Sequence, residues 1–105
     1  MGLKLKTLSV RLDGKLKPFE VVLNKGSSIL EFIDKTGDTT VKLVVLEAPV
    51  ENDEIDRRKL CFYQADDKEV EVPYGAVYIA MSKGTYWSPF MLFDITHCAT
   101  SELDE

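Results

Sequence analysis

One stretch of this chain decides the fold, because it occurs twice. The first copy, Val22–Phe32, reads VLNKGSSILEF, and the second, Glu71–Met81, reads EVPYGAVYIAM. Each copy has the pattern of a strand, a tight glycine turn and a second strand, with the two glycines in register. We therefore expect two similar three-strand units that pack against each other.

Each copy continues through a further turn into an apolar run closed by an acid, Leu43–Glu47 in the first and Phe90–Asp94 in the second. This continuation places the two repeat units at residues 19–48 and 68–96. The alternative is that the likeness reflects only the strand–turn–strand pattern that recurs along any all-β chain.

The rest of the chain also has the pattern of an antiparallel all-β domain. Short β-rich runs alternate with turn residues, and no helical periodicity lasts longer than one or two turns. The sequence predicts a single β-sandwich or flattened barrel of about eight short strands, with pseudo-two-fold symmetry if the repeat holds. The expected strands are Leu8–Leu12, Phe19–Leu23, Ser28–Ile33, Thr39–Glu47, Lys59–Gln64, Lys68–Val72, Ala76–Met81 and Trp87–Thr96.

Two of these strands are apolar on both faces, Leu43–Leu46 and Phe90–Phe93. Continuous apolar runs are typical of strands in the middle of a sheet, whereas alternating runs cover one face. We expect both strands to be interior and mostly buried. Leu3 and Leu5 are out of phase with Leu8 and Val10, which predicts either a bulge near Lys6 or a strand that begins after it.

Size and charge restrict the class of protein. The 105 residues suffice for one domain with its own core, expected over residues 1–98, with residues 99–105 a polar, acidic and frayed tail. The formal net charge of −5 argues against direct binding to nucleic acid phosphates. Neither a membrane span nor a secretory signal is expected, so the protein is predicted to be cytoplasmic, with Cys61 and Cys98 as free thiols.

The sequence offers weak candidates for catalysis or metal binding. His97 is the only histidine, and with Cys98 and either Cys61 or Asp94 it could form a metal site. However, no ligands occur in pairs at the short spacing of zinc sites, and neighbouring strand residues point to opposite faces. We expect no metal, no cofactor and no enzymatic activity, and we interpret Cys61 as a small core residue.

Two surface segments are the candidates for binding a partner. Tyr86 and Trp87 precede Pro89, which cannot donate to a strand ladder, so these rings either cap the core or anchor a partner. Tyr74 lies at a turn and adds to the aromatic set. The segment 48–58 is predicted to be a surface loop whose acids form a charged rim; they are Glu51, Asp53, Glu54 and Asp56.

The middle of the chain resembles a small family of β-domains found in bacteriophages and prophages. The shared pattern is the Lys-Gly turn and Ile-Leu pair of Leu23–Phe32, a variable turn, and the long apolar strand of Val41–Pro49, which ends in an acid and Ala-Pro. The resemblance implies a phage origin and brings no known activity or site residues.

The lack of a catalytic constellation, together with the aromatic and acidic surface segments, predicts a non-enzymatic binding protein. The resemblance implies that it is encoded by a phage and acts on a host protein in the host cytoplasm. Inhibition of a host enzyme or defence system is the example that the resemblance suggests. The alternative is a virion accessory, assembly or decoration protein that works by self-association, as a homo-oligomer.

Overall fold

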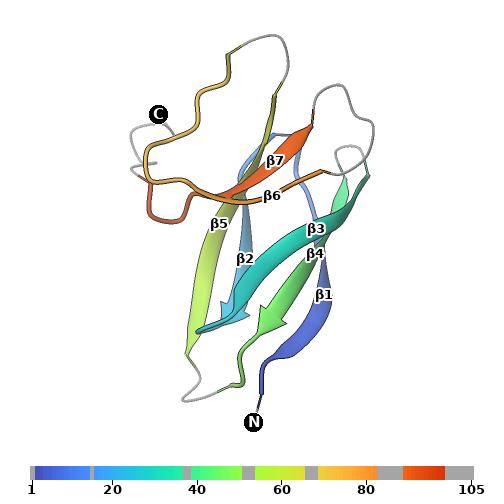
Figure 1. The fold of residues 1–105 in the computed structure, drawn as a ribbon, viewed down its shortest axis with the longest axis vertical. Coiled ribbons are helices and arrows are strands. Elements are labelled where there is room, and N and C mark those ends of the chain that lie inside the picture. The colour runs from blue at the N-terminus through green and yellow to red at the C-terminus, as the bar shows by residue number, and fades with distance from the viewer. Residues whose placement is uncertain are drawn as a thin grey trace.

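The computed structural model describes residues 2–14, 16–36, 39–50, 54–65, 69–82 and 89–98. This described part contains seven strands and no helix, where about eight strands were expected (Figure 1). The missing strand is the predicted Lys68–Val72, because residues 69–72 do not form a strand. The strands are β1 (Lys4–Arg11), β2 (Phe19–Asn24), β3 (Ser28–Thr36), β4 (Thr40–Glu47), β5 (Ile55–Gln64), β6 (Val77–Met81) and β7 (Phe90–Asp94).

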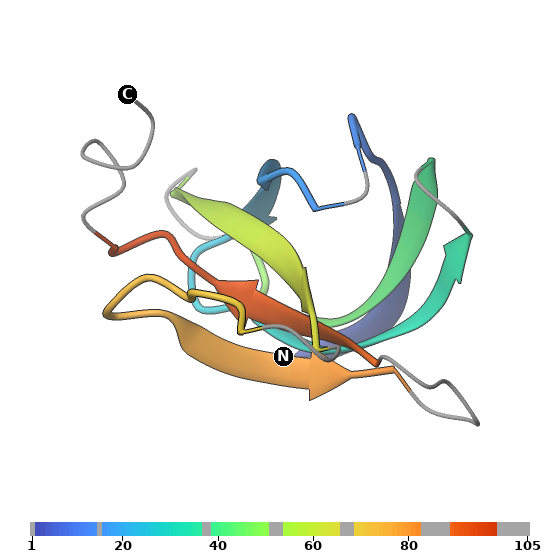
Figure 2. The ribbon, with the colours of Figure 1, turned by 90° about the horizontal axis from the view of Figure 1, so that it is seen from above.

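The strands form two antiparallel sheets, which confirms the predicted all-β sandwich. One sheet has the order β1-β4-β3 and the other has the order β2-β5-β7-β6. Figure 2 shows the two sheets curving around a common interior. The edge strands β3 and β6 pack against each other along one side of this interior.

The main core fills the space between the sheets, and Phe62 of β5 is at its centre. The Phe62 ring lies 5.9 Å from Phe19, 4.9 Å from Phe32 and 6.4 Å from Phe90, measured between ring centroids. Such contacts combine a large buried area with favourable ring geometry. The other large side chains of this core that are fully buried are Val41, Leu43, Val45, Leu60 and Leu92.

The two strands predicted to be interior, β4 and β7, are interior. Their inward side chains, such as Leu43 and Leu92, are fully buried. Their outward side chains, such as Val44 and Phe93, are only partly buried. The apolar character of both faces therefore gives each sheet a second, partly exposed apolar surface.

The first glycine turn does not form a hairpin, although its sequence suggests one. β2 and β3 belong to different sheets, so the turn Asn24–Ser27 carries the chain from one sheet to the other. The Ser27 Oγ accepts a hydrogen bond from the Ala48 backbone N (2.9 Å), and the Asn24 Nδ2 donates to the Ala48 carbonyl (2.9 Å). These bonds hold the turn against the end of β4. They join residues distant in the chain, so a local sequence pattern does not predict them.

The two glycine turns nevertheless share their geometry. In each, the fourth residue donates to the carbonyl of the first, Ser27 to Asn24 (3.1 Å) and Ala76 to Pro73 (3.2 Å). The φ angles of Gly26 and Gly75 are 92° and 90°, as expected at the third position of a type II turn.

The likeness continues along the strand that follows each turn. The register shifts between the third and fifth residues after each glycine, Ile29/Glu31 in β3 and Tyr78/Ala80 in β6. Each bulged strand then pairs with the next strand, β3 with β4 and β6 with β7. The segments before the turns differ, since β2 is a strand and residues 69–72 are not, so the repeat boundaries 19–48 and 68–96 remain a prediction.

Two expectations about strand limits are wrong. β1 runs from Lys4 without a register shift, so there is no bulge near Lys6, and Leu5 lies on the outer surface with 67% of its area exposed. β5 begins at Ile55, within the segment expected to be a loop. Its polar residues join the ladder because β2 supplies partners for them; Arg57, for example, pairs with Val22.

Candidate functional site

The predicted acidic rim is engaged in local ion pairs wherever the structure describes it. Glu54 Oε2 lies 3.1 Å from Lys25 Nζ, and Asp56 Oδ2 lies 3.2 Å from Arg58 Nη2. The Arg58 guanidinium also donates to the Ser27 carbonyl. These two acids therefore help to fasten β5 to the first glycine turn. Glu51 and Asp53 lie outside the described residues.

Of the three predicted aromatic anchors, only Tyr74 falls in the described part. Its side chain is 100% exposed at the tip of the second glycine turn, while Tyr86 and Trp87 lie outside the described residues. The turn of Tyr74 is next to the C-terminal end of the domain, since a Cβ on Gly75 would lie 3.6 Å from the His97 carbonyl.

The structure does not bring Tyr74 together with the described acids. Glu54 accompanies the first glycine turn, where its carbonyl accepts a hydrogen bond from the Lys25 backbone N (3.2 Å). In Figure 1 the turn that leads into β6 lies well away from the start of β5. Tyr74 and Glu54 therefore do not form a single surface patch.

A different apolar surface covers the outer face of the four-stranded sheet. The Phe93 ring of β7 lies between two tyrosines, 5.6 Å from Tyr63 of β5 and 5.7 Å from Tyr78 of β6, both with edge-on geometry. This row crosses three adjacent strands. Tyr78 remains 53% exposed, so the row reaches solvent at the β6 edge. We call these three residues the aromatic row.

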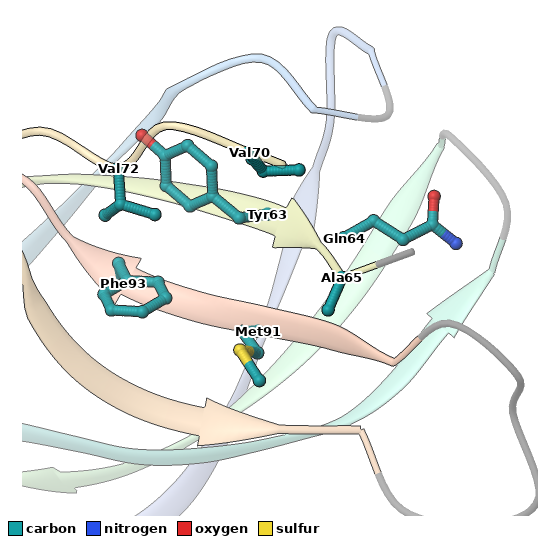
Figure 3. Close-up of a pocket in the computed structure, with 7 residues that line it drawn as sticks. All are labelled: Tyr63, Gln64, Ala65, Val70, Val72, Met91 and Phe93. Carbon is teal, nitrogen blue, oxygen red and sulfur yellow. The ribbon is translucent and has the colours of Figure 1, made fainter. Parts of the chain in front are cut away.

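A pocket of about 200 Å³ opens beside the aromatic row (Figure 3). Tyr63 and Phe93 contribute to it from the sheet, together with Met91. Val70 and Val72 contribute from the segment between β5 and β6. Gln64 and Ala65 also line it. Among the described residues that line the pocket, Tyr63 is the one with an ionisable side chain.

A small second core lies on the same outer face, towards the end of β7. It consists of Cys61, Ile95 and Cys98, all buried, with Tyr63, Ala76 and Phe93 packed around them. Cys61 is the buried residue that the sequence predicts, and both cysteines are free thiols. The Cys61 thiol donates to the Leu16 carbonyl at 3.4 Å.

Burial controls the ionisation of Cys61 and Tyr63. It raises the pKa of Cys61, with a smaller opposing effect from the hydrogen bond with Tyr63. Burial also raises the pKa of Tyr63 well above its ordinary value, and the nearby Cys61 raises it further. Both groups are therefore neutral at physiological pH, which is the opposite of what an activated nucleophile needs.

The candidate metal ligands named from the sequence lie in different surroundings. His97 is exposed, whereas Cys61 and Cys98 are buried among apolar side chains. Within the described residues, no three His, Cys, Asp or Glu side chains are placed to hold a metal ion.

Sequence reasoning missed the outer face, although a signal for it was present. In the interior runs Leu60–Tyr63 and Phe90–Phe93, odd-numbered and even-numbered residues are both apolar. Because alternate residues of a strand face opposite sides of the sheet, such runs predict an apolar surface on each side. What the sequence did not show is that Val70 and Val72 would cover only part of that second surface.

Comparison with known proteins adds nothing to this picture. No protein-family model, curated protein or solved structure matches the chain. No helix in the described part of the chain has the length and hydropathy to cross a membrane. Function is therefore inferred from the chemistry of the surface.

Proposed function

We propose that this chain is a non-enzymatic protein-binding domain whose binding surface is the outer face of the four-stranded sheet. The observation that carries the proposal is the aromatic row, which ends in solvent at Tyr78 and adjoins an open apolar pocket. Tyrosine and phenylalanine are enriched at protein interfaces, because their rings bury a large area at a small cost in conformational entropy.

The chemistry of the pocket favours binding over catalysis. General acid–base catalysis needs two convergent titratable groups, and the described part of the lining supplies one, Tyr63. Burial raises the pKa of Tyr63, so its phenol stays protonated at neutral pH and is not available as a general base.

The partner is proposed from the resemblance and the charge. The likeness to phage and prophage β-domains suggests a host protein as the target, for example a host enzyme or defence system that the binding inhibits, in the host cytoplasm. The net charge of −5 disfavours nucleic acid as the partner. Tyr74, fully exposed on the neighbouring turn, remains a candidate anchor beside this face, and the predicted contributions of Tyr86 and Trp87 remain predictions.

The test is capture of partners from a bacterial lysate by immobilised wild-type protein and by two matched variants. Tyr78→Lys places a charge on the aromatic row, and Leu5→Lys places the same charge on the outer face of the other sheet. Both positions are more than half exposed, so both variants should fold. We expect Tyr78→Lys to lose a partner that Leu5→Lys retains. Equal capture by both variants would place the binding surface elsewhere.

Self-association is the second candidate, and strand β1 favours it. β1 is an edge strand with Leu5 exposed on it and Leu3 exposed just before it, and an unpaired edge can pair with another chain. Light scattering coupled to size-exclusion chromatography distinguishes the two functions. A monomer or dimer supports action on another protein, and a trimer or larger ring supports assembly.

A further inference from the structure

The pocket beside the aromatic row has the size of a side-chain site. Its volume of about 200 Å³ is below the roughly 300–1,000 Å³ of typical small-molecule sites. It exceeds the roughly 150 Å³ of an apolar cavity known to hold a benzene molecule in another protein. The pocket therefore has room for one aromatic ring or one branched aliphatic side chain.

One wall of the pocket has the geometry of an unpaired strand. Val70 and Val72 line the pocket (Figure 3), whereas the alternate residues Glu69 and Glu71 do not. This period of two is that of an extended chain. Among the described residues, no backbone hydrogen bond joins residues 69–72 to another segment, so their backbone donors and acceptors are open to a ligand.

The same wall is acidic on its other side. Glu69 and Glu71 are both exposed and alternate with the two valines. A strand paired with residues 69–72 would place every second side chain opposite these carboxylates and the others towards the pocket. Opposite charges in such cross-strand positions stabilise the pairing.

We propose that the pocket binds one apolar side chain of an extended, basic peptide segment of the partner, and that this segment pairs with residues 69–72. The ligand pattern is an aliphatic or aromatic residue with Lys or Arg on each side of it. This mode is β-strand addition, in which main-chain hydrogen bonds give affinity and alternate pockets give specificity. The inference rests on the proposed function, for which it names the recognised chemistry.

The test begins with a displayed library of random twelve-residue peptides selected against the immobilised wild-type protein. We expect enrichment of sequences in which Lys or Arg alternates with an apolar residue. Enrichment of acidic or proline-rich peptides, or no enrichment, would overturn the inference.

The enriched peptide is then synthesised, and its affinity is measured by fluorescence anisotropy for a matched series of variants. Val72→Lys places a positive charge in the pocket lining, where it repels a basic peptide, and should weaken binding by about tenfold or more. Glu71→Lys should weaken binding a few fold, and more at low salt than at high salt. Val50→Lys, at an exposed valine outside the pocket lining, is the control and should leave the affinity unchanged.

Pairing through the backbone has a separate readout. N-methylation of those peptide amides that face residues 69–72 should weaken binding strongly, whereas N-methylation of the intervening amides should not. Unchanged affinity for Val72→Lys, or equal effects of both methylation patterns, would show that the peptide binds elsewhere or in another conformation.

The outcomes separate this inference from the proposed function. If Tyr78→Lys abolishes capture of the lysate partner but Val72→Lys has no effect on that capture, the face binds a folded surface and only the peptide mode is wrong. If neither variant affects capture, both proposals fail.

Discussion

One glycine fixes the conformation of each of the two turns that precede β3 and β6. Gly26 and Gly75 have φ angles near +90°, a region that residues with a Cβ rarely adopt. The space around them is ordinary, since the nearest atom to an added Cβ is 3.5 Å away at Gly26 and 3.6 Å away at Gly75. The requirement for glycine is therefore one of backbone conformation and not of packing.

We predict that Gly26→Ala and Gly75→Ala each lower the free energy of unfolding by about 1–2 kcal/mol, because alanine is strained at positive φ. Urea denaturation followed by fluorescence measures the change. Gly2→Ala is the control, with no atom within 4 Å of the added Cβ, and should leave stability unaltered. A loss of less than half a kilocalorie at both turns would mean that the turns relax to another conformation.

A second residue-scale feature is the pair formed by the buried Cys61 and the partly buried Tyr63. Burial disfavours the thiolate and the phenolate, so both pKa values are raised in the folded state. The unfolded chain then loses these protons first as the pH rises. The contribution of the neutral thiol to the free energy of unfolding is fully present below the thiol pKa of the unfolded chain, about 8.5. It declines as the pH rises from there towards the higher thiol pKa of the folded protein.

We predict that the urea midpoint of the wild-type protein falls as the pH is raised from neutrality to above 10. Cys61→Ala should flatten the part of this decline that begins near the unfolded thiol pKa, and Tyr63→Phe should flatten the part above about pH 10. Parallel pH profiles for the wild type and both variants would mean that neither group is responsible.

At the scale of strands, position in the sheet decides how much each apolar residue contributes. β4 and β7 are interior, and Leu43 and Leu92 on their inner faces are fully buried. β1 is an edge strand whose Leu5 is exposed. Lys6 of β1 pairs with Glu47 of β4 at 2.9 Å, which adds a surface ion pair between these two strands.

We predict that Leu43→Ala and Leu92→Ala each lower the free energy of unfolding by about 2–5 kcal/mol, the range for removing a buried leucine. Leu5→Ala should change it by no more than about 0.5 kcal/mol. Chemical denaturation provides all three values. A large loss for Leu5→Ala would show that the outer face of the three-stranded sheet is buried in solution, as self-association requires.

At the scale of the whole molecule, the four-stranded sheet has an apolar core on each side. Phe62 centres the core between the sheets, and Ile95 belongs to the small second core outside them. The backbone N of Ile95 donates to the Lys59 carbonyl (2.8 Å), which ties the second core to β5. Both cores therefore depend on the same strands.

We predict that the two cores unfold together. Ile95→Ala should lower the free energy of unfolding by about 2–5 kcal/mol and leave a single transition that coincides by circular dichroism and fluorescence. An early, separate fluorescence transition in this variant would show that the second core opens independently of the sandwich.

The sequence by itself determined the class of fold and several of its parts. The predicted interior strands, the two glycine turns and the burial of Cys61 all follow from local rules, namely a period of two, turn chemistry and apolar content. Such rules hold because they depend only on neighbouring residues. For the same reason the likeness of the two turns, Asn24–Ser27 and Pro73–Ala76, was visible in the sequence.

Only the tertiary structure decided how these parts are combined. It separates β2 and β3 into different sheets, draws the polar start of β5 into a ladder with β2, and leaves residues 69–72 outside both sheets. It also aligns Tyr78 with Phe93 to form the aromatic row. These outcomes depend on pairing between segments distant in the chain, where one apolar strand can replace another, so no local pattern specifies the choice.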